Sequence, residues 1–117
     1  MTKMTSRVRI SVIVPVYNGG AALWRCLDAL AANSRGEASE SWHLCEKDAN
    51  FAYEVIAVDD GSTDGSAALA AAHGCHVLHT AHPRSGPATA RNLGAVAASG
   101  DVVFFVDADV AVQPETV

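Results

Sequence analysis

The sequence predicts a three-layer α/β fold with a mainly parallel sheet, on the basis of three observations. Short apolar runs recur along the chain, helical patterns separate them, and acidic or glycine-rich turns follow them. Strands that alternate with helices usually pair in parallel through right-handed crossovers. The chain has 117 residues, half of them apolar, which suits one small domain with a packed core.

Four apolar runs are expected to form the strands of this sheet. The first and the last are nearly continuous in Val, Ile and Phe, rather than alternating with polar residues. Continuous runs suit strands that are covered on both faces, as parallel strands usually are. The runs are Ile10–Val16, Val55–Val58, His76–Leu78 and Val102–Val106.

Three helices are expected between these strands. Leucines at positions 23, 27 and 30 share one helical face, and the alanines of Ala67–Ala72 have a high helix propensity. Ser62 or Thr63 is expected to cap the alanine helix. Pro87 suits the first turn of the third helix, because the N–H that proline lacks would have no helical partner there.

Residues 33–50 break this alternation of strands and helices. The stretch is polar and shows no clear period, and it is longer than the usual connection of about 2–6 residues. We expect an irregular surface insertion within a single domain that spans residues 1–117.

Charge and composition exclude several classes of function. The net charge is −5 and the arginines are scattered, so the basic footprint of a nucleic-acid-binding protein is missing. Three cysteines at wide spacing suggest no disulfide framework. The first apolar run is too short for a signal peptide or a transmembrane segment. We therefore expect a cytoplasmic protein that is, at most, peripheral to the membrane.

Candidate functional residues follow three of the four predicted strands. Tyr17 follows the first strand, Asp59 and Asp60 follow the second, and Asp107-Ala108-Asp109 follows the last. Ligands of open α/β sheets bind beside the carboxyl ends of the strands, so we expect these side chains to share one rim. Carboxylates that lie this close together favour a cationic neighbour.

The two aspartates after the last strand are candidates for a metal site. Alternate residues of an extended chain point the same way, so Asp107 and Asp109 can face one ligand. Their oxygens suit Mg²⁺ or Mn²⁺, which would bridge to the phosphates of a substrate. The plainer alternative is that one aspartate caps the next turn and the other is solvated.

The acidic pair after the second strand is the more unusual feature. A tight turn and a helix cap explain Gly61 and Ser62, but they leave the two carboxylates of Asp59 and Asp60 unexplained. One of these is expected to accept the imide N–H of a uracil-like base. A calcium-binding loop is excluded, because Ala71 stands where that loop needs a bidentate glutamate.

Tyr17 and Arg91 each have a functional and a structural interpretation. The ring of Tyr17 is placed to stack on a base, or to pack against the neighbouring loop. Arg91 lies one turn into the helix that begins at Pro87, whose first N–H groups suit an anion. We expect Arg91 to pair with a phosphate or with one of the acids, or to be solvated.

Four blocks of sequence, in this order, resemble the family 2 glycosyltransferases. The resemblance covers nearly the whole chain except residues 33–50. It implies the GT-A fold, in which a Rossmann-like nucleotide-binding half is joined to an acceptor half that this chain would lack. The blocks are Ser11–Asn18, Val58–Ser66, Gly86–Gly94 and Phe105–Asp109.

For the nucleotide base, the resemblance implies a pocket at the end of the first two strands. Pro15 and Tyr17 would line this pocket, with Tyr17 near a uracil ring. Asp60 would accept the imide N–H of uracil, and Asp59 would support it. The donor would be a nucleotide-sugar, with a UDP-sugar favoured, and the acceptor stays unknown.

For the diphosphate, the resemblance implies roles for three further residues. Arg91 would lie near the diphosphate, and Asp107 would contact the ribose or a metal-bound water. Asp109 would be the direct ligand of Mg²⁺ or Mn²⁺, and Asp107 would complete the metal motif. Transfer in this family resembles a single in-line displacement with inversion.

No catalytic base is assigned from the sequence. The family places an acidic base well beyond the paired aspartates, so it is expected beyond Val117, and we expect nucleotide binding with little sugar transfer. One alternative is a nucleotide-binding module without catalysis. Another is a haloacid-dehalogenase-like phosphotransferase, which places its acidic motif on the first strand and needs a later lysine; the only lysines here are Lys3 and Lys47.

Overall fold

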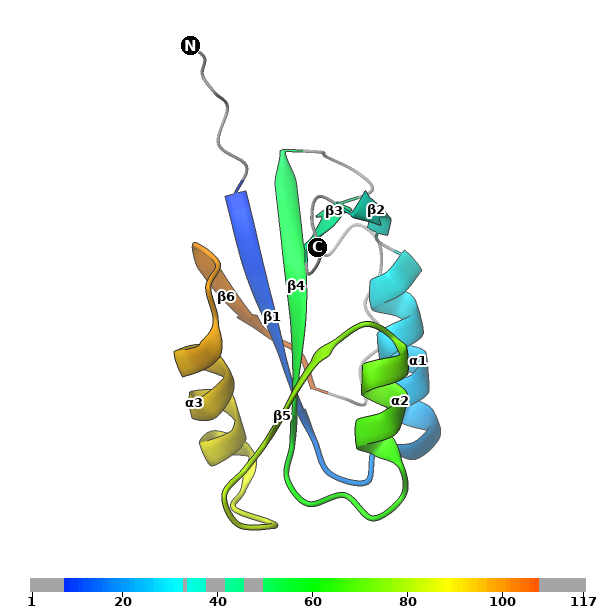
Figure 1. The fold of residues 1–117 in the computed structure, drawn as a ribbon, viewed down its shortest axis with the longest axis vertical. Helices are drawn as coiled ribbons and strands as arrows, with labels where there is room; N and C mark the ends of the chain where they lie inside the picture. Colours follow the sequence, from blue (N-terminus) through cyan, green and yellow to red (C-terminus); the bar gives the residue numbers. More distant parts are fainter. Residues whose placement is uncertain (1–7, 33, 38–41, 46–49, 108–117) are drawn as a thin grey trace.

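The computed structural model describes residues 8–32, 34–37, 42–45 and 50–107, and the predicted alternation of strands and helices is confirmed (Figure 1). Every predicted strand and helix is present, with bounds that differ by a few residues. The elements are β1 (Val8–Val16), α1 (Gly20–Ala32), β2 (Ser34–Glu37), β3 (His43–Cys45), β4 (Phe51–Asp59), α2 (Ser66–Ala72), β5 (His76–His79), α3 (Pro87–Ala97) and β6 (Val102–Phe105).

The four predicted strands pair in parallel in the order β5-β4-β1-β6. β1 and β4 run side by side over their whole length, from the pair Val8 and Phe51 to the pair Val16 and Asp59. The two central strands therefore end at the same level. The loops that follow them emerge together at the lower end of the molecule in Figure 1.

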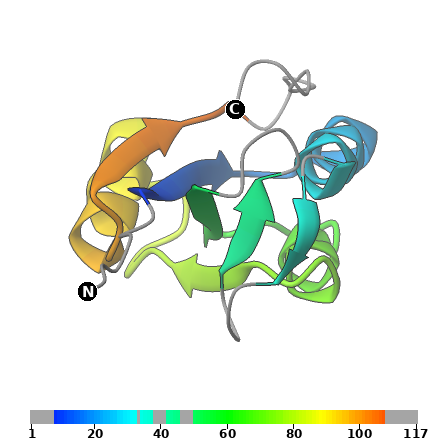
Figure 2. The same ribbon diagram turned by 90° about the horizontal axis from the view of Figure 1, so that it is seen from above.

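Helices cover both faces of the sheet, which explains the continuous apolar runs. α1 and α2 lie on one face and α3 lies on the other, as both views show (Figures 1 and 2). Alternate residues of β1 point into the two layers: Val12 and Val14 pack in the cluster with α1 and α2, and Ile13 packs in the cluster with α3. Two apolar cores result, one on each side of the sheet.

The expectation that residues 33–50 are irregular was wrong for two described segments, which form β2 and β3. β2 and β3 form an antiparallel pair, and β3 adds to β4 opposite Ala52 and Tyr53. β5 takes over the same edge of β4 from Ile56 onward. The part of the β4 edge that β5 does not cover supplies backbone donors and acceptors, so a polar segment without an apolar period can pair there.

Gly94 sets the distance between α3 and the sheet. A Cβ atom at this position would meet Cγ2 of Ile13 far inside van der Waals contact, and Cγ2 of Val58 at 3.2 Å. Both of these side chains belong to the buried cluster on the α3 face. The helix therefore packs this closely only because residue 94 has no side chain.

We expect Gly94→Ala to lower the free energy of unfolding by about 1–3 kcal/mol, the usual cost of overpacking a core. Urea denaturation followed by circular dichroism measures the change. Val96→Ala is the matched control, because Val96 lies on the same helix with 86% of its side chain exposed. Equal stability of Gly94→Ala and the wild type would show that α3 can shift outward freely.

Candidate functional site

The loops after β1 and β4 are tied together by hydrogen bonds between their backbone and side chains. The N–H of Asn18 donates to Oγ of Ser62 at 2.9 Å, and the N–H of Thr63 donates to Oδ1 of Asn18 at 2.8 Å. The prediction that Ser62 or Thr63 caps α2 was therefore wrong. The cap residue is Gly65, which has no side-chain bond to offer.

Asp60 is buried and holds the loop between β5 and α3. Its Oδ1 accepts hydrogen bonds from the hydroxyl of Thr80 and the N–H of Ser85, both at 2.8 Å. Its Oδ2 accepts the N–H of Gly86 at 2.9 Å. Burial acts to raise the pKa of Asp60, but these donors outweigh burial and hold the pKa below its ordinary value of 3.8.

Gly61 allows the two loops to approach each other. Its φ of +92° favours glycine, and a Cβ atom there would lie 2.6 Å from Cβ of Pro83. The backbone of the turn after β4 therefore packs directly against Pro83 in the loop after β5. The glycine that the sequence predicts for a tight turn at position 61 therefore also permits this contact.

Asp59 is buried to the same degree as Asp60 but is less completely hydrogen-bonded. Its Oδ2 accepts the N–H of Ser62 at 3.2 Å and lies 3.5 Å from Nδ1 of His79. Its Oδ1 is buried and has no hydrogen-bond partner in the described part of the chain. An unpaired buried oxygen costs free energy, so native structures seldom leave one without a reason.

A pocket of about 180 Å³ brings four of the predicted site residues together. It opens between the ends of β1 and β6 and the first turn of α3. The ring of Tyr17 is 42% exposed, and the guanidinium of Arg84 lies 5.1 Å from its centroid. The residues that line the pocket are Pro15, Val16, Tyr17, Asp60, Pro87, Ala90 and Asp107.

Asp107 forms an ion pair at the mouth of this pocket. Its Oδ1 lies 3.6 Å from a guanidinium nitrogen of Arg91, and both side chains are well exposed. Asp59 does not line the pocket, and Asp109 lies outside the described residues. β6 is the last described strand on its side of the sheet, yet Asp107 shares a pocket with Tyr17 and Asp60.

Several residues that organise this site could not be identified from sequence patterns. Asn18, Thr80 and Ser85 act through hydrogen bonds between loops that are far apart in the chain, and Arg84 contacts Tyr17 across the same gap. The positive φ of Asn18 and Arg84, at 49° and 59°, marks both as turn residues. Only the asparagine type at position 18 hints at such a turn.

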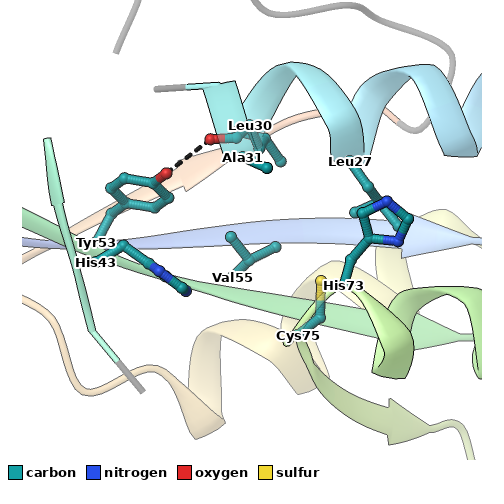
Figure 3. A pocket seen from close by; sticks show the side chains of 8 residues that line it. All are labelled: Leu27, Leu30, Ala31, His43, Tyr53, Val55, His73 and Cys75. Carbon is teal, nitrogen blue, oxygen red and sulfur yellow. Dashed lines mark hydrogen bonds between the residues drawn. The ribbon is translucent and has the colours of Figure 1, made fainter. Parts of the chain in front are cut away.

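A second pocket, of about 210 Å³, lies on the α1 and α2 face between β3, β4 and the two helices (Figure 3). The hydroxyl of Tyr53 donates to the carbonyl of Leu30 at its rim. Burial raises the pKa of Cys75 to about 12, so its thiol stays protonated.

Among the described residues, no group of three or more His, Cys, Asp or Glu side chains is placed to hold a metal.

We expect Asp60→Asn to lower stability by about 1–3 kcal/mol near neutral pH, because it breaks bonds to buried N–H groups. The lowered pKa of Asp60 makes its stabilisation complete above about pH 4, and this stabilisation is lost as the pH falls through the native pKa. The variant should therefore lose less stability than the wild type between about pH 5 and pH 3. Urea denaturation across this range measures both effects, with exposed Asp28→Asn as control; parallel profiles for Asp60→Asn and the wild type would contradict the assignment.

The described helices include none that is long and apolar enough to span a membrane.

Residues 11–117 match the family model described as glycosyl transferase family 2. The chain is 35% identical over 114 residues to an uncharacterized glycosyltransferase, YibD, of Escherichia coli strain K12; the match covers 95% of this chain and 29% of YibD.

Two solved structures share the fold. TarS 1–349 of S. aureus in complex with UDP-GlcNAc is 29% identical, with a TM-score of 0.72, over 93% of this chain and 29% of that one. Glucosyl-3-phosphoglycerate synthase of Mycobacterium tuberculosis, in complex with Mn²⁺, UDP and glucosyl-3-phosphoglycerate, is 27% identical, with a TM-score of 0.66, over 92% and 36%. The chain thus spans about a third of the length of these proteins. It has the GT-A fold, and it belongs to glycosyl transferase family 2.

Proposed function

We propose that this chain is the donor-binding part of a glycosyltransferase and holds a nucleoside diphosphate sugar at the carboxyl ends of β1, β4 and β6. The observation that carries the proposal is the pocket shared by Pro15, Tyr17, Asp60 and Asp107. Its position beside the carboxyl ends of a parallel sheet is the usual ligand site of such folds. The complexes of related proteins with UDP-GlcNAc and with UDP support this choice of ligand.

For the base, the lining of the pocket favours Asp60 over Asp59 as the partner of the imide N–H. Asp60 lines the pocket and accepts two donors on Oδ1 but one on Oδ2, so a carboxylate with about four acceptor positions keeps one for a ligand. Asp59 keeps a buried oxygen without a partner. Because Asp59 does not line the pocket, we assign the imide N–H of uracil to Asp60, with Asp59 in support and with Pro15 and Tyr17 packing beside the ring.

For the diphosphate, Asp107 and Asp109 supply the carboxylates for Mg²⁺ or Mn²⁺. Asp107 is exposed at the pocket mouth, and carboxylate oxygen is the donor type that these ions prefer. One or two carboxylates with substrate phosphates are the usual way of binding Mg²⁺. A bound ion would stabilise the negative charge of the departing nucleoside diphosphate. Arg91 would then turn from Asp107 to a phosphate oxygen.

The phosphotransferase alternative is set aside because the chain belongs to another family and its acidic motif follows β6, far from the first strand in sequence. A nucleotide-binding module without catalysis would use the same pocket. The glycosyltransferase and the binding module differ only in sugar transfer, so binding is measured first and turnover of a nucleotide-sugar second. Transfer of the sugar by a single displacement with inversion is part of the glycosyltransferase proposal.

We expect Asp60→Asn to weaken the binding of UDP by about 10–100-fold, the value of a lost hydrogen bond to a charged group. Isothermal titration of the 117-residue chain with UDP and with GDP measures the change. Asp28→Asn, an exposed acid on α1, serves as control. If Asp60→Asn binds UDP as the wild type does while Asp59→Ala loses binding, the base contact belongs to Asp59.

We expect Mn²⁺ to strengthen UDP binding by the wild type and to have no effect on Asp109→Ala. The reason is that the variant lacks the carboxylate assigned as the direct ligand of the ion. Titrations with and without Mn²⁺ give the comparison, and uridine, which has no phosphate, is the control ligand. An undiminished effect of Mn²⁺ on Asp109→Ala would remove the metal role from this residue.

A further inference from the structure

We propose a second ligand site on the α3 face of the sheet, where Glu54 would bind the ammonium group of a small alkylamine. The site lies in the notch where the outer edge of β4 changes partner, after Tyr53 pairs with β3 and before Ile56 pairs with β5. A pocket of about 320 Å³ occupies this notch. That volume falls within the common range of small-molecule sites, about 300–1,000 Å³.

Glu54 is the reason to expect a cation in this pocket. The residue is only 4% exposed and lines the pocket from the middle of β4. Its Oε2 accepts the hydroxyl of Ser11 at 2.6 Å, and the N–H and hydroxyl of Ser99 at 3.1 and 3.3 Å. Its Oε1 makes no hydrogen bond in the described part of the chain.

No basic side chain forms an ion pair with Glu54 among the described residues. Buried carboxylates in proteins are usually paired with a cation, since hydrogen bonds from neutral donors compensate only part of the lost hydration. The donors here, from Ser11 and Ser99, all bind Oε2. The position left for a cationic partner is beside Oε1, on the pocket side.

The rest of the lining fits an ammonium on a short aliphatic stem. Ile56 and Leu78 offer apolar surface beside Glu54, and the Trp42 ring borders the same pocket. That ring accepts a cation from the chain itself, because the guanidinium of Arg9 lies 5.3 Å from its centroid. The carboxylate of Glu54 and the apolar surface beside it together select an alkylammonium over a neutral or anionic ligand.

This site is independent of the proposed nucleotide site. Asp59 and Asp60 stand at the carboxyl end of β4, whereas Glu54 lies in its first half. Different pockets and different residues serve the two sites. Failure of either proposal leaves the other untouched.

The test is a titration of the isotope-labelled 117-residue chain with n-butylammonium chloride, followed by nuclear magnetic resonance. We expect saturable shifts of the Ser99 amide and the Trp42 indole, and at least about tenfold weaker binding of 1-butanol, which has the stem without the charge. Nα-acetyl-lysine methylamide, titrated in parallel, distinguishes a free amine from a lysine side chain. Binding of butylammonium alone assigns the pocket to free amines, and equal binding assigns it to lysine.

Glu54→Gln tests the residue itself, since glutamine keeps an acceptor for the serines and removes the charge. We expect the variant to bind butylammonium at least about tenfold more weakly and no better than butanol. Asp28→Asn, which removes an exposed charge on the opposite face, should bind as the wild type does. Equal binding of butylammonium and butanol by the wild type overturns the proposal, whether or not Glu54→Gln folds.

Discussion

The hydrogen bonds that Asp60 accepts from the β5–α3 loop hold this loop against the end of β4, where the candidate site lies. Donors from Thr80, Ser85 and Gly86 converge on one buried carboxylate. These donors set where α3 begins, because Gly86 is the residue immediately before Pro87. The wall that α3 gives to the pocket thus depends on a side chain from β4.

The order of the elements could be predicted because it depends on patterns within short segments. Ile10–Val16 is apolar on both faces, and the structure covers both faces with helices. The clustering of Tyr17, Asp60 and Asp107 followed from one rule about parallel sheets, together with the equal ends of β1 and β4.

The contacts between loops could not be predicted, because each depends on two segments far apart in sequence. Ser62 has the residue type and position of a helix cap, but its hydroxyl oxygen accepts the N–H of Asn18 instead. The polar segment that contains β3 pairs with β4 through backbone groups, which leave no pattern in the side chains. Local propensity is a weak guide where tertiary hydrogen bonds compete for the same groups.

Three buried carboxylates on or beside β4 show how differently one strand can satisfy acidic side chains. Asp60 has donors on both oxygens, whereas Glu54 and Asp59 each have donors on one oxygen only. A fully bonded carboxylate stabilises the fold, and a partly bonded one leaves part of its desolvation cost uncompensated. The sequence letters alone do not separate these cases, since only the surrounding donors differ.

The ion pair between Arg91 and Asp107 bears on how the proposed donor site would fill. Both side chains are exposed, and such pairs contribute only about 0–1 kcal/mol. Breaking the pair therefore costs little, and each partner has a stronger one in the proposed complex: a metal ion for Asp107 and a phosphate for Arg91. The buried contacts of Asp60 are not exchangeable in this way, because removing them would leave N–H groups unpaired. A rigid wall from Asp60 and a weakly held pair at the mouth together suit a site that must bind and release a charged ligand.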